Sequence, residues 1–146
     1  MERFNLTGLN YVRASSTVAR ILYESGEAKE PCNQSKHDCK SDARLISEHV
    51  FGMDFGRMVL SDALATAEQS ERINEIIARR ITGEPLQYIL GEAWFMGLLF
   101  GVQPGILIPR RDSEVLADTA IKRAPQGAQV LDMCCGSGCL GITLAA

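Results

Sequence analysis

The sequence has 146 residues, and 15 lysines and arginines against 18 aspartates and glutamates give a formal net charge of −3. Charged residues make up 23% and hydrophobic residues 46% of the chain, as in an ordinary globular protein. The acidic balance and the lack of a basic block argue against direct nucleic-acid binding through phosphate neutralisation. The five cysteines are odd in number, and Cys134, Cys135 and Cys139 lie close together, which favours reduced thiols in the cytoplasm over a secreted disulfide framework.

No segment has the pattern of a membrane-spanning helix or of a signal peptide. The longest uncharged stretch, residues 93–109, contains two prolines and three glycines, a composition unlike that of a membrane-spanning helix. The sequence begins MERFNLTG, and no apolar run follows it. The sequence therefore predicts no membrane partner and no secretion signal.

The residues up to Gly83 predict a small helical bundle. A first helix is expected over residues 7–25, with Thr7 as its N-cap and Gly26 as its end. Residues 27–42 carry seven charges and few apolar side chains, so we expect a mobile loop there. Because the helices are short, they must bury their apolar stripes against one another.

Two further helices are expected in this bundle. One begins at Ala43 and ends at Gly52, and residues 54–60 add a short turn. The other carries the clearest signal, because Thr66 and Gln69 fit a capping box and four isoleucines (73, 76, 77 and 81) form one apolar stripe. Gly83 and Pro85 are expected to close that helix.

From Leu86 the pattern changes to that of a β-hairpin. Apolar residues alternate with their neighbours around Gly97, which predicts two short strands joined by a tight turn. We interpret residues 84–108 as this hairpin and its linker. The alternating residues are Trp94, Met96, Leu98, Phe100 and Val102, and we expect Trp94, Phe95 and Phe100 to form the hairpin core.

The remaining residues, 109–146, predict the start of an α/β domain. A helix is expected to open at Asp112 or Ser113 and to run to Arg123, with Glu114 near the positive end of its dipole. Residues 129–133 are typical of a buried strand, and a glycine-rich loop and another helix follow. This order is the opening unit of a doubly wound, Rossmann-like sheet, so the predicted fold class is α/β. An exposed edge of this single strand would favour self-association.

The glycine-rich loop is the motif most directly linked to chemistry. Residues 131–138 read LDMCCGSG, in which Gly136 and Gly138 let the backbone turn sharply near a ligand. The next residues complete a G-x-G-x-x-G pattern, which dinucleotide-binding proteins also carry. However, Asp132 lies four residues before Gly136, and this Asp-x-x-x-Gly-x-Gly spacing resembles motif I of class I methyltransferases that use S-adenosylmethionine. A simple structural turn between a strand and a helix is the alternative.

A second segment carries a more specific resemblance. Residues 83–116 read GEPLQYILGEAWFMGLLFGVQPGILIPRRDSEVL. In combination with the glycine-rich loop, GEPLQY and LIPR-x-DSE closely resemble the release factor glutamine methyltransferase family, from about Ser41 to Ala146. The resemblance implies a helical substrate-recognition domain at residues 1–83, S-adenosylmethionine as cofactor, and a peptide chain release factor as the protein substrate.

The resemblance also implies two sets of site residues. The loop around the cofactor would contain Asp132, Cys134, Cys135, Gly136, Ser137 and Gly138. The edge of the same pocket would contain Phe100, Pro109, Arg110, Asp112, Ser113 and Glu114.

This sequence departs from the family pattern at three points. Arg111 stands where the family usually has proline, and Cys134 stands where motif I usually has its first glycine. The backbone at Cys134 must therefore adopt a negative φ or accept strain. The Asn-Pro-Pro-Tyr motif that holds the substrate amide is absent from these residues, so we expect an N-terminal fragment that is inactive by itself.

Other interpretations of the sequence remain open. One alternative is a non-catalytic protein-binding module, and another is an amino-methyltransferase that acts on a ribosomal protein or a nucleic acid. A third, less favoured alternative is a dinucleotide oxidoreductase. Cys32, His37 and Cys39 fit no common zinc-finger spacing, and so we expect no metal site.

Overall fold

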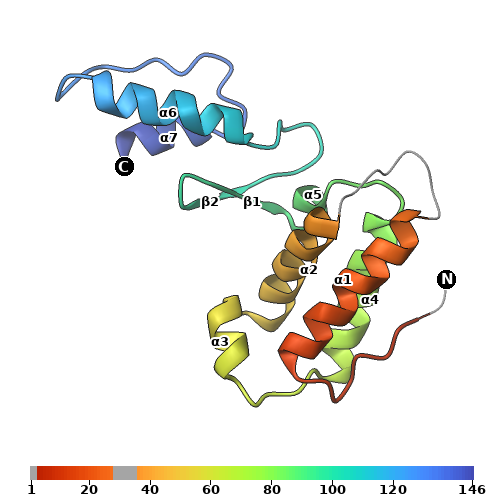
Figure 1. The fold of residues 1–146 in the computed structure, drawn as a ribbon. Coiled ribbons are helices and arrows are strands. Elements are labelled where there is room, and N and C mark those ends of the chain that lie inside the picture. Colours follow the sequence, from red (N-terminus) through yellow and green to blue (C-terminus); the bar gives the residue numbers. More distant parts are fainter. Residues whose placement is uncertain (1–2, 28–35) are drawn as a thin grey trace. The chain divides into compact units, whose positions relative to one another are not determined.

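The structure, a computed structural model, describes residues 3–27 and 36–146 and divides them into two compact units. The first unit covers Met1–Leu90 and the second Gly91–Ala146. Figure 1 shows that the first unit is helical and that the second holds a hairpin and two helices. Within the residues described, no helix combines the length and the apolar character needed to cross a membrane.

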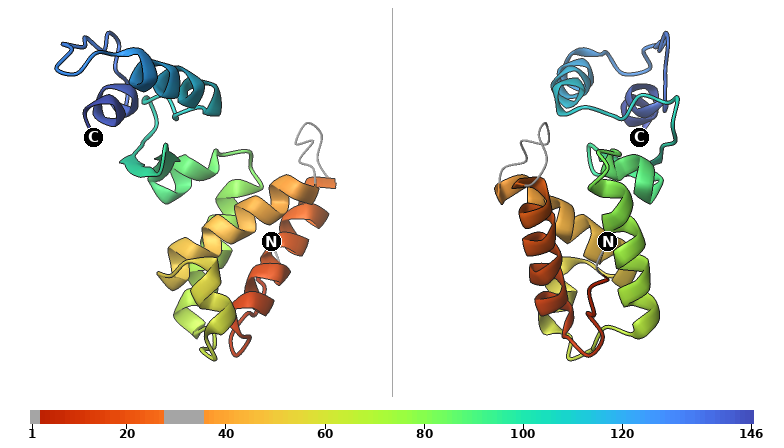
Figure 2. Two further views of the ribbon diagram at one scale, coloured as in Figure 1. Left: turned by 60° about the vertical axis from the view of Figure 1, so that its left-hand side comes forward. Right: turned by 90° about the vertical axis from the view of Figure 1, so that its right-hand side faces the viewer.

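The first unit is a small helical bundle, as predicted. Helix α2 packs against both α1 and α4, and the two further views in Figure 2 show these helices side by side. Its apolar core includes Val18 of α1, Ile46 of α2 and Ile73 of α4, all of which are fully buried. The helices are α1 (Tyr11–Glu27), α2 (Lys36–Phe51), α3 (Phe55–Leu60), α4 (Ala67–Arg80) and α5 (Leu86–Leu90).

The segment before α1 is fastened to α4 by hydrogen bonds. The Phe4 amide donates to Asn74 Oδ1 at 3.0 Å, the Asn74 side chain donates back to the Phe4 carbonyl at 2.8 Å, and the Leu6 amide donates to Ser70 Oγ at 3.0 Å. These bonds explain why the polar side chains of Ser70 and Asn74 are buried.

The predicted start of the first helix was wrong. Thr7 lies in a turn, where its amide donates to Asn5 Oδ1, and α1 begins at Tyr11. Asn10 caps the helix instead, because its side chain accepts from the Arg13 amide at 2.9 Å. Thr and Asn are both good caps, and hydrophobic spacing alone did not separate the two positions.

The predicted loop at residues 27–42 was also wrong in its last part. Helix α2 begins at Lys36 rather than at Ala43. The many charges of residues 36–42 suggested a solvated loop, but two residues hold this segment to the bundle. Cys39 is buried in the core, and the half-buried Asp42 pairs with Arg80 of α4 at 2.8 Å. Residues 28–35 of the expected loop lie outside the described residues.

The predicted end of the first helix was also wrong, because α1 continues through Gly26 to Glu27, whereas the signals at α3 and at the start of α4 were confirmed. Asp54 caps α3, which covers the expected short turn. Thr66 and Gln69 form the predicted capping box of α4, in which each backbone amide donates to the other side chain. Helix α5 was not predicted, because its five residues adjoin the hairpin pattern.

The second unit contains the predicted hairpin, followed by α6 (Arg111–Arg123) and α7 (Cys139–Ala145). Strands β1 (Glu92–Phe95) and β2 (Leu98–Gly101) pair antiparallel. Met96 and Gly97 form the turn with φ values of +50° and +79°, the left-handed pair that suits the twist of a two-residue hairpin. Helix α6 begins one residue before the predicted positions and ends at the predicted Arg123.

The hairpin core differs from the prediction at one residue. The small core of this unit contains Phe95, Phe100, Ala117 and Cys139, and the two phenylalanine rings meet edge to face with centroids 6.3 Å apart. Trp94 is 60% exposed, because alternation places it on the face of β1 opposite to Phe95, across from Leu99. Its assignment to the core was therefore wrong.

The predicted strand at residues 129–133 is not formed. The sheet described consists of β1 and β2, so this segment has no neighbouring strand to satisfy its backbone hydrogen bonds. Leu131 is 81% exposed and Met133 76% exposed, although the sequence predicts burial. The described residues are thus helical with a small two-stranded antiparallel sheet.

Candidate functional site

The glycine-rich loop before α7 has a left-handed backbone at three positions. Cys134, Gly136 and Gly138 have φ values of +59°, +57° and +75°. The Gly138 amide donates to the Cys135 carbonyl at 2.8 Å, which closes a tight turn immediately before the helix. Glycine is the residue best suited to such a backbone. Of the two outcomes predicted for Cys134, a negative φ or a strained backbone, the structure therefore has the strained one.

Replacing Cys134 by glycine is expected to stabilise the loop. The left-handed backbone disfavours a residue with a Cβ by about 1–2 kcal/mol, and the greater freedom of unfolded glycine offsets part of this, which leaves a gain of about 0.5–1 kcal/mol. Amide exchange in α7 of the Cys134→Gly variant measures the gain. Cys134→Ala is the control, because it removes the thiol and keeps the Cβ; equal exchange in the two variants would contradict the strain.

Asp132 holds this loop against the helix that follows. Its Oδ2 atom accepts the Gly141 amide at 3.0 Å, and a Cβ on Gly141 would lie only 3.2 Å from that oxygen. Glycine at position 141 therefore permits the close approach of the carboxylate. Asp132 thus has a structural role through Gly141, the last glycine of the G-x-G-x-x-G pattern, whatever the loop binds.

The polar groups of the loop fit a polar ligand. The Ser137 hydroxyl is buried and has no hydrogen-bond partner among the described residues, while the Cys134 and Cys135 residues are exposed. Gly136 has open space where a Cβ would lie. A buried hydroxyl without a partner is costly, so a ligand or a further segment that bonds to it would relieve that cost.

The residues expected at the pocket edge lie in the same unit and occupy different environments. Phe100 is buried in the same apolar cluster as Cys139, the first residue of α7, so the hairpin and the helix that follows the loop share one small core. Glu114 accepts the Met96 amide at 2.9 Å through Oε1. The other four precede or open α6: Pro109 and Ser113 are half-buried, and Arg110 and Asp112 are exposed.

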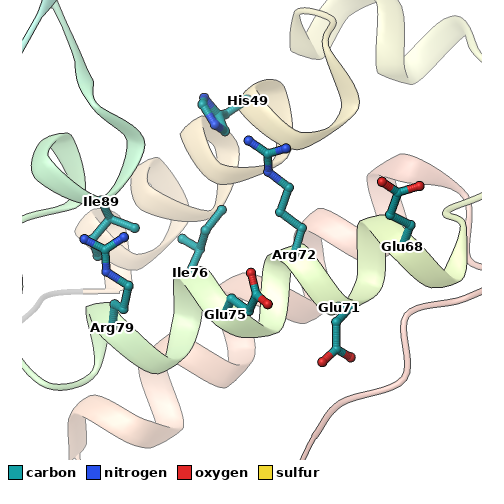
Figure 3. A pocket seen from close by; sticks show the side chains of 8 residues that line it. All are labelled: His49, Glu68, Glu71, Arg72, Glu75, Ile76, Arg79 and Ile89. Carbon is teal, nitrogen blue, oxygen red and sulfur yellow. The ribbon is translucent and has the colours of Figure 1, made fainter.

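The first unit has a groove of about 440 Å³ that the sequence did not reveal. Figure 3 shows Arg72 extending from α4 toward His49 of α2. Among the described residues, Arg72 forms no ion pair, so its charge is available to a partner. The only signal in the sequence was the charged face of α4, which by itself is typical of a solvated helix. The groove is lined by His49, Glu68, Glu71, Arg72, Glu75, Ile76, Arg79 and Ile89.

Ion pairs neutralise part of this groove. Arg79 donates two hydrogen bonds to Glu84, and Arg3 pairs with Glu71 at 2.9 Å. The hydrogen bond from Arg79 is the main reason why the pKa of the Glu84 carboxyl lies below its ordinary value, and Glu84 in turn raises the pKa of Arg79. The adjacent Arg80 pairs with Asp42, outside the groove lining.

The described residues give no support to a metal centre. In residues 3–27 and 36–146, histidine, cysteine, aspartate and glutamate side chains form no group of three or more that would hold a metal ion. Of the residues considered above as zinc ligands, Cys39 is buried in the helical core, and Cys32 lies outside the described residues.

Comparison with known proteins finds one matching family model and several relatives that share one name. Residues 33–91 match the family model described as the PrmC N-terminal domain. A release factor glutamine methyltransferase from Geobacter sulfurreducens is 44% identical over 109 residues, which cover 71% of this chain and 38% of that protein. Those from Nitratidesulfovibrio vulgaris and Escherichia coli are 42% and 34% identical, over 88% and 77% of this chain and 41% of each relative.

The chain thus spans about two fifths of the length of these relatives. The matched part includes GEPLQY and LIPRRDSE, the segments on which the resemblance was first based. The predicted resemblance is therefore confirmed: residues 33–91 match the model of the PrmC N-terminal domain, and the chain is similar to part of several release factor glutamine methyltransferases.

Proposed function

We propose that this chain is the N-terminal part of a cytoplasmic, S-adenosylmethionine-dependent methyltransferase. Its substrate would be the side-chain amide of the glutamine in the Gly-Gly-Gln motif of peptide chain release factors. The observation that carries this proposal is the similarity to several release factor glutamine methyltransferases, which covers 71–88% of the chain in the three relatives above.

The glycine-rich loop is the proposed cofactor site. When bound, S-adenosylmethionine supplies an electrophilic methyl group. Asp132 positions the loop through Gly141, Gly136 leaves the backbone open to the methionine part of the cofactor, and Gly138 provides the left-handed turn before α7. The Ser137 hydroxyl is a candidate donor to its carboxylate. Cys134 and Cys135 would lie along the same loop, in the first turn of a Rossmann-like domain that begins at residue 109.

Transfer to an amide nitrogen depends mainly on positioning. The nitrogen lone pair is delocalised into the carbonyl, so the amide must be held in line with the methyl group. Residues 1–146 contain no Asn-Pro-Pro-Tyr sequence to hold it. We propose that these residues contribute the cofactor loop and substrate recognition and do not transfer a methyl group on their own.

We propose that the helical part, residues 1–83, recognises the release factor, and that residues 84–108 connect it to the cofactor domain. The groove of the first unit supports this role, because it combines the apolar Ile76 with the available charge of Arg72. A folded protein partner offers both apolar and charged groups to such a surface.

A chimera tests the proposed function. Residues 1–146 replace the corresponding part of the Geobacter sulfurreducens relative, and methyl transfer from labelled S-adenosylmethionine to a release factor is measured. We expect transfer to the wild-type factor and none to a factor in which the Gly-Gly-Gln glutamine is alanine. Residues 1–146 alone should transfer nothing.

Two outcomes would overturn this assignment. Transfer to a ribosomal protein or a nucleic acid, with none to the release factor, would favour the alternative amino-methyltransferase. Binding of residues 1–146 to a protein partner, with an inactive chimera, would favour the non-catalytic binding module.

The sheet edge expected at residues 129–133 is not formed, but the exposed apolar segment after α6 offers another surface for self-association of residues 1–146. Val130, Leu131 and Met133 present apolar side chains to solvent. We propose that copies of the chain associate through this segment. Sedimentation equilibrium tests this: a monomer at high concentration would contradict it.

A further inference from the structure

The turn of the hairpin is bound by a carboxylate from α6. Met96 is the first turn residue, with φ at +50°, and Phe95 and Leu98 form the last pair of the ladder before it. The Met96 amide therefore has no partner strand, and it donates instead to Glu114 Oε1 at 2.9 Å. A residue other than glycine is disfavoured in this left-handed backbone, so the bond offsets part of that cost.

We infer that Glu114 is a positioning residue, which sets the hairpin turn on the first turn of α6 and so fixes the segment that leads into α6. The inference rests on the proposed function, in which that segment forms the edge of the cofactor pocket. The resemblance implied only a place for Glu114 at this edge. The structure gives its carboxylate a specific contact, to the hairpin backbone.

The position of Glu114 on α6 shows how its contact with the hairpin is linked to the glycine-rich loop. Ala117 lies three residues later, on the same side of the helix, and belongs to the core that joins the hairpin to α7. Phe100 of the hairpin and Cys139 of α7 belong to the same core, and Cys139 directly follows the glycine-rich loop. The carboxylate contact and the apolar core thus hold the hairpin at two neighbouring places on α6.

Amide exchange of Met96 in residues 1–146 tests the contact without any cofactor. In Glu114→Ala, we expect the protection of the Met96 amide to fall by about five- to tenfold, the effect of losing one hydrogen bond. Glu114→Gln keeps an acceptor oxygen and should retain most of the protection. Asp118→Ala is the control, because it removes an exposed carboxylate of the same helix that pairs with Lys122.

The chimera gives the functional readout. Glu114→Ala should raise KM for S-adenosylmethionine by about five- to tenfold with little change in kcat, and Glu114→Gln should restore KM, because a positioning contact acts on the pocket edge rather than on the transferred group. Any one of three results would overturn the inference. The first is unchanged exchange of the Met96 amide in Glu114→Ala, and the second is a Glu114→Gln variant that is as defective as Glu114→Ala. The third is a loss of protection in Glu114→Ala that is equally large at Phe95 and throughout α7. An inactive wild-type chimera would refute the proposed function, whereas the Met96 exchange would still decide the contact.

Discussion

Replacing Phe95 by alanine is expected to destabilise the second unit by about 3–5 kcal/mol, the usual cost of removing a buried phenylalanine side chain. Phe95 is 1% exposed, and it packs with Phe100 in the core that joins the hairpin, α6 and α7. A unit of this size rarely has more than about 3–5 kcal/mol of stability. We therefore expect Gly91–Ala146 to unfold in the variant while the helical unit remains folded.

Trp94→Ala is the matched control for this prediction. Trp94 is larger and adjacent in the sequence, but it is 60% exposed on the opposite face of β1. Two-dimensional NMR of amide groups reports the two units separately. Loss of dispersed signals from the second unit is expected in Phe95→Ala only. Equal losses in both variants would show that the two faces of the hairpin do not differ as described.

Replacing Arg80 by methionine is expected to destabilise the helical unit by about 1–3 kcal/mol, because it removes the ion pair that Arg80 forms with the half-buried carboxylate of Asp42. Arg80 Nε donates to Asp42 Oδ2 at 2.8 Å, and the two side chains are each 16% exposed. Arg80 also donates to the Glu84 carbonyl at 3.2 Å, so it joins α4 to both α2 and the segment before α5.

The neighbouring arginine provides the comparison. Arg79 also forms an ion pair, with Glu84, but its side chain is 51% exposed. Water and dissolved salt screen an exposed ion pair, so Arg79→Met should have little effect on the free energy of unfolding. Chemical denaturation followed by circular dichroism measures both variants. A larger loss in Arg79→Met than in Arg80→Met would contradict the assignment of the anchoring role to Arg80.

Local signals in the sequence predicted much of the fold. The capping box of α4 and the turn at Met96 and Gly97 depend on residues close in the chain, and both were confirmed. The start of α2 depends instead on contacts between distant residues. Asp42 and Arg80 are 38 residues apart, and no local pattern distinguishes such a pair from solvated charges.

The strand expected at residues 129–133 failed for a related reason. An apolar run indicates that a segment tends to be buried, but a strand also requires a neighbour with which to pair. Within the described residues, that neighbour is absent. Trp94 was misplaced because composition favoured burial of an aromatic side chain, whereas the register of the hairpin decides which face each residue occupies.

The sequence predicted the position of the candidate site but not the contacts within it. The glycine pattern located the loop. The presence of a residue other than glycine at position 134 correctly indicated that the backbone there could be strained. Neither the contact from Asp132 to Gly141 nor that from Glu114 to Met96 follows from the sequence, because each depends on the path of the backbone. The groove on α4 was missed because it requires the relative positions of α2, α4 and α5.

The attachment of the N-terminal segment to α4 has a consequence for synthesis of the protein. Phe4 and Leu6 bond to residues 70 and 64 positions later in the chain. On the ribosome, these first residues emerge long before α4 does, so they stay without their final contacts while α1, α2 and α3 are made. Because their partners Asn74 and Ser70 lie on α4, the helical unit completes its assembly only after α4 has left the exit tunnel.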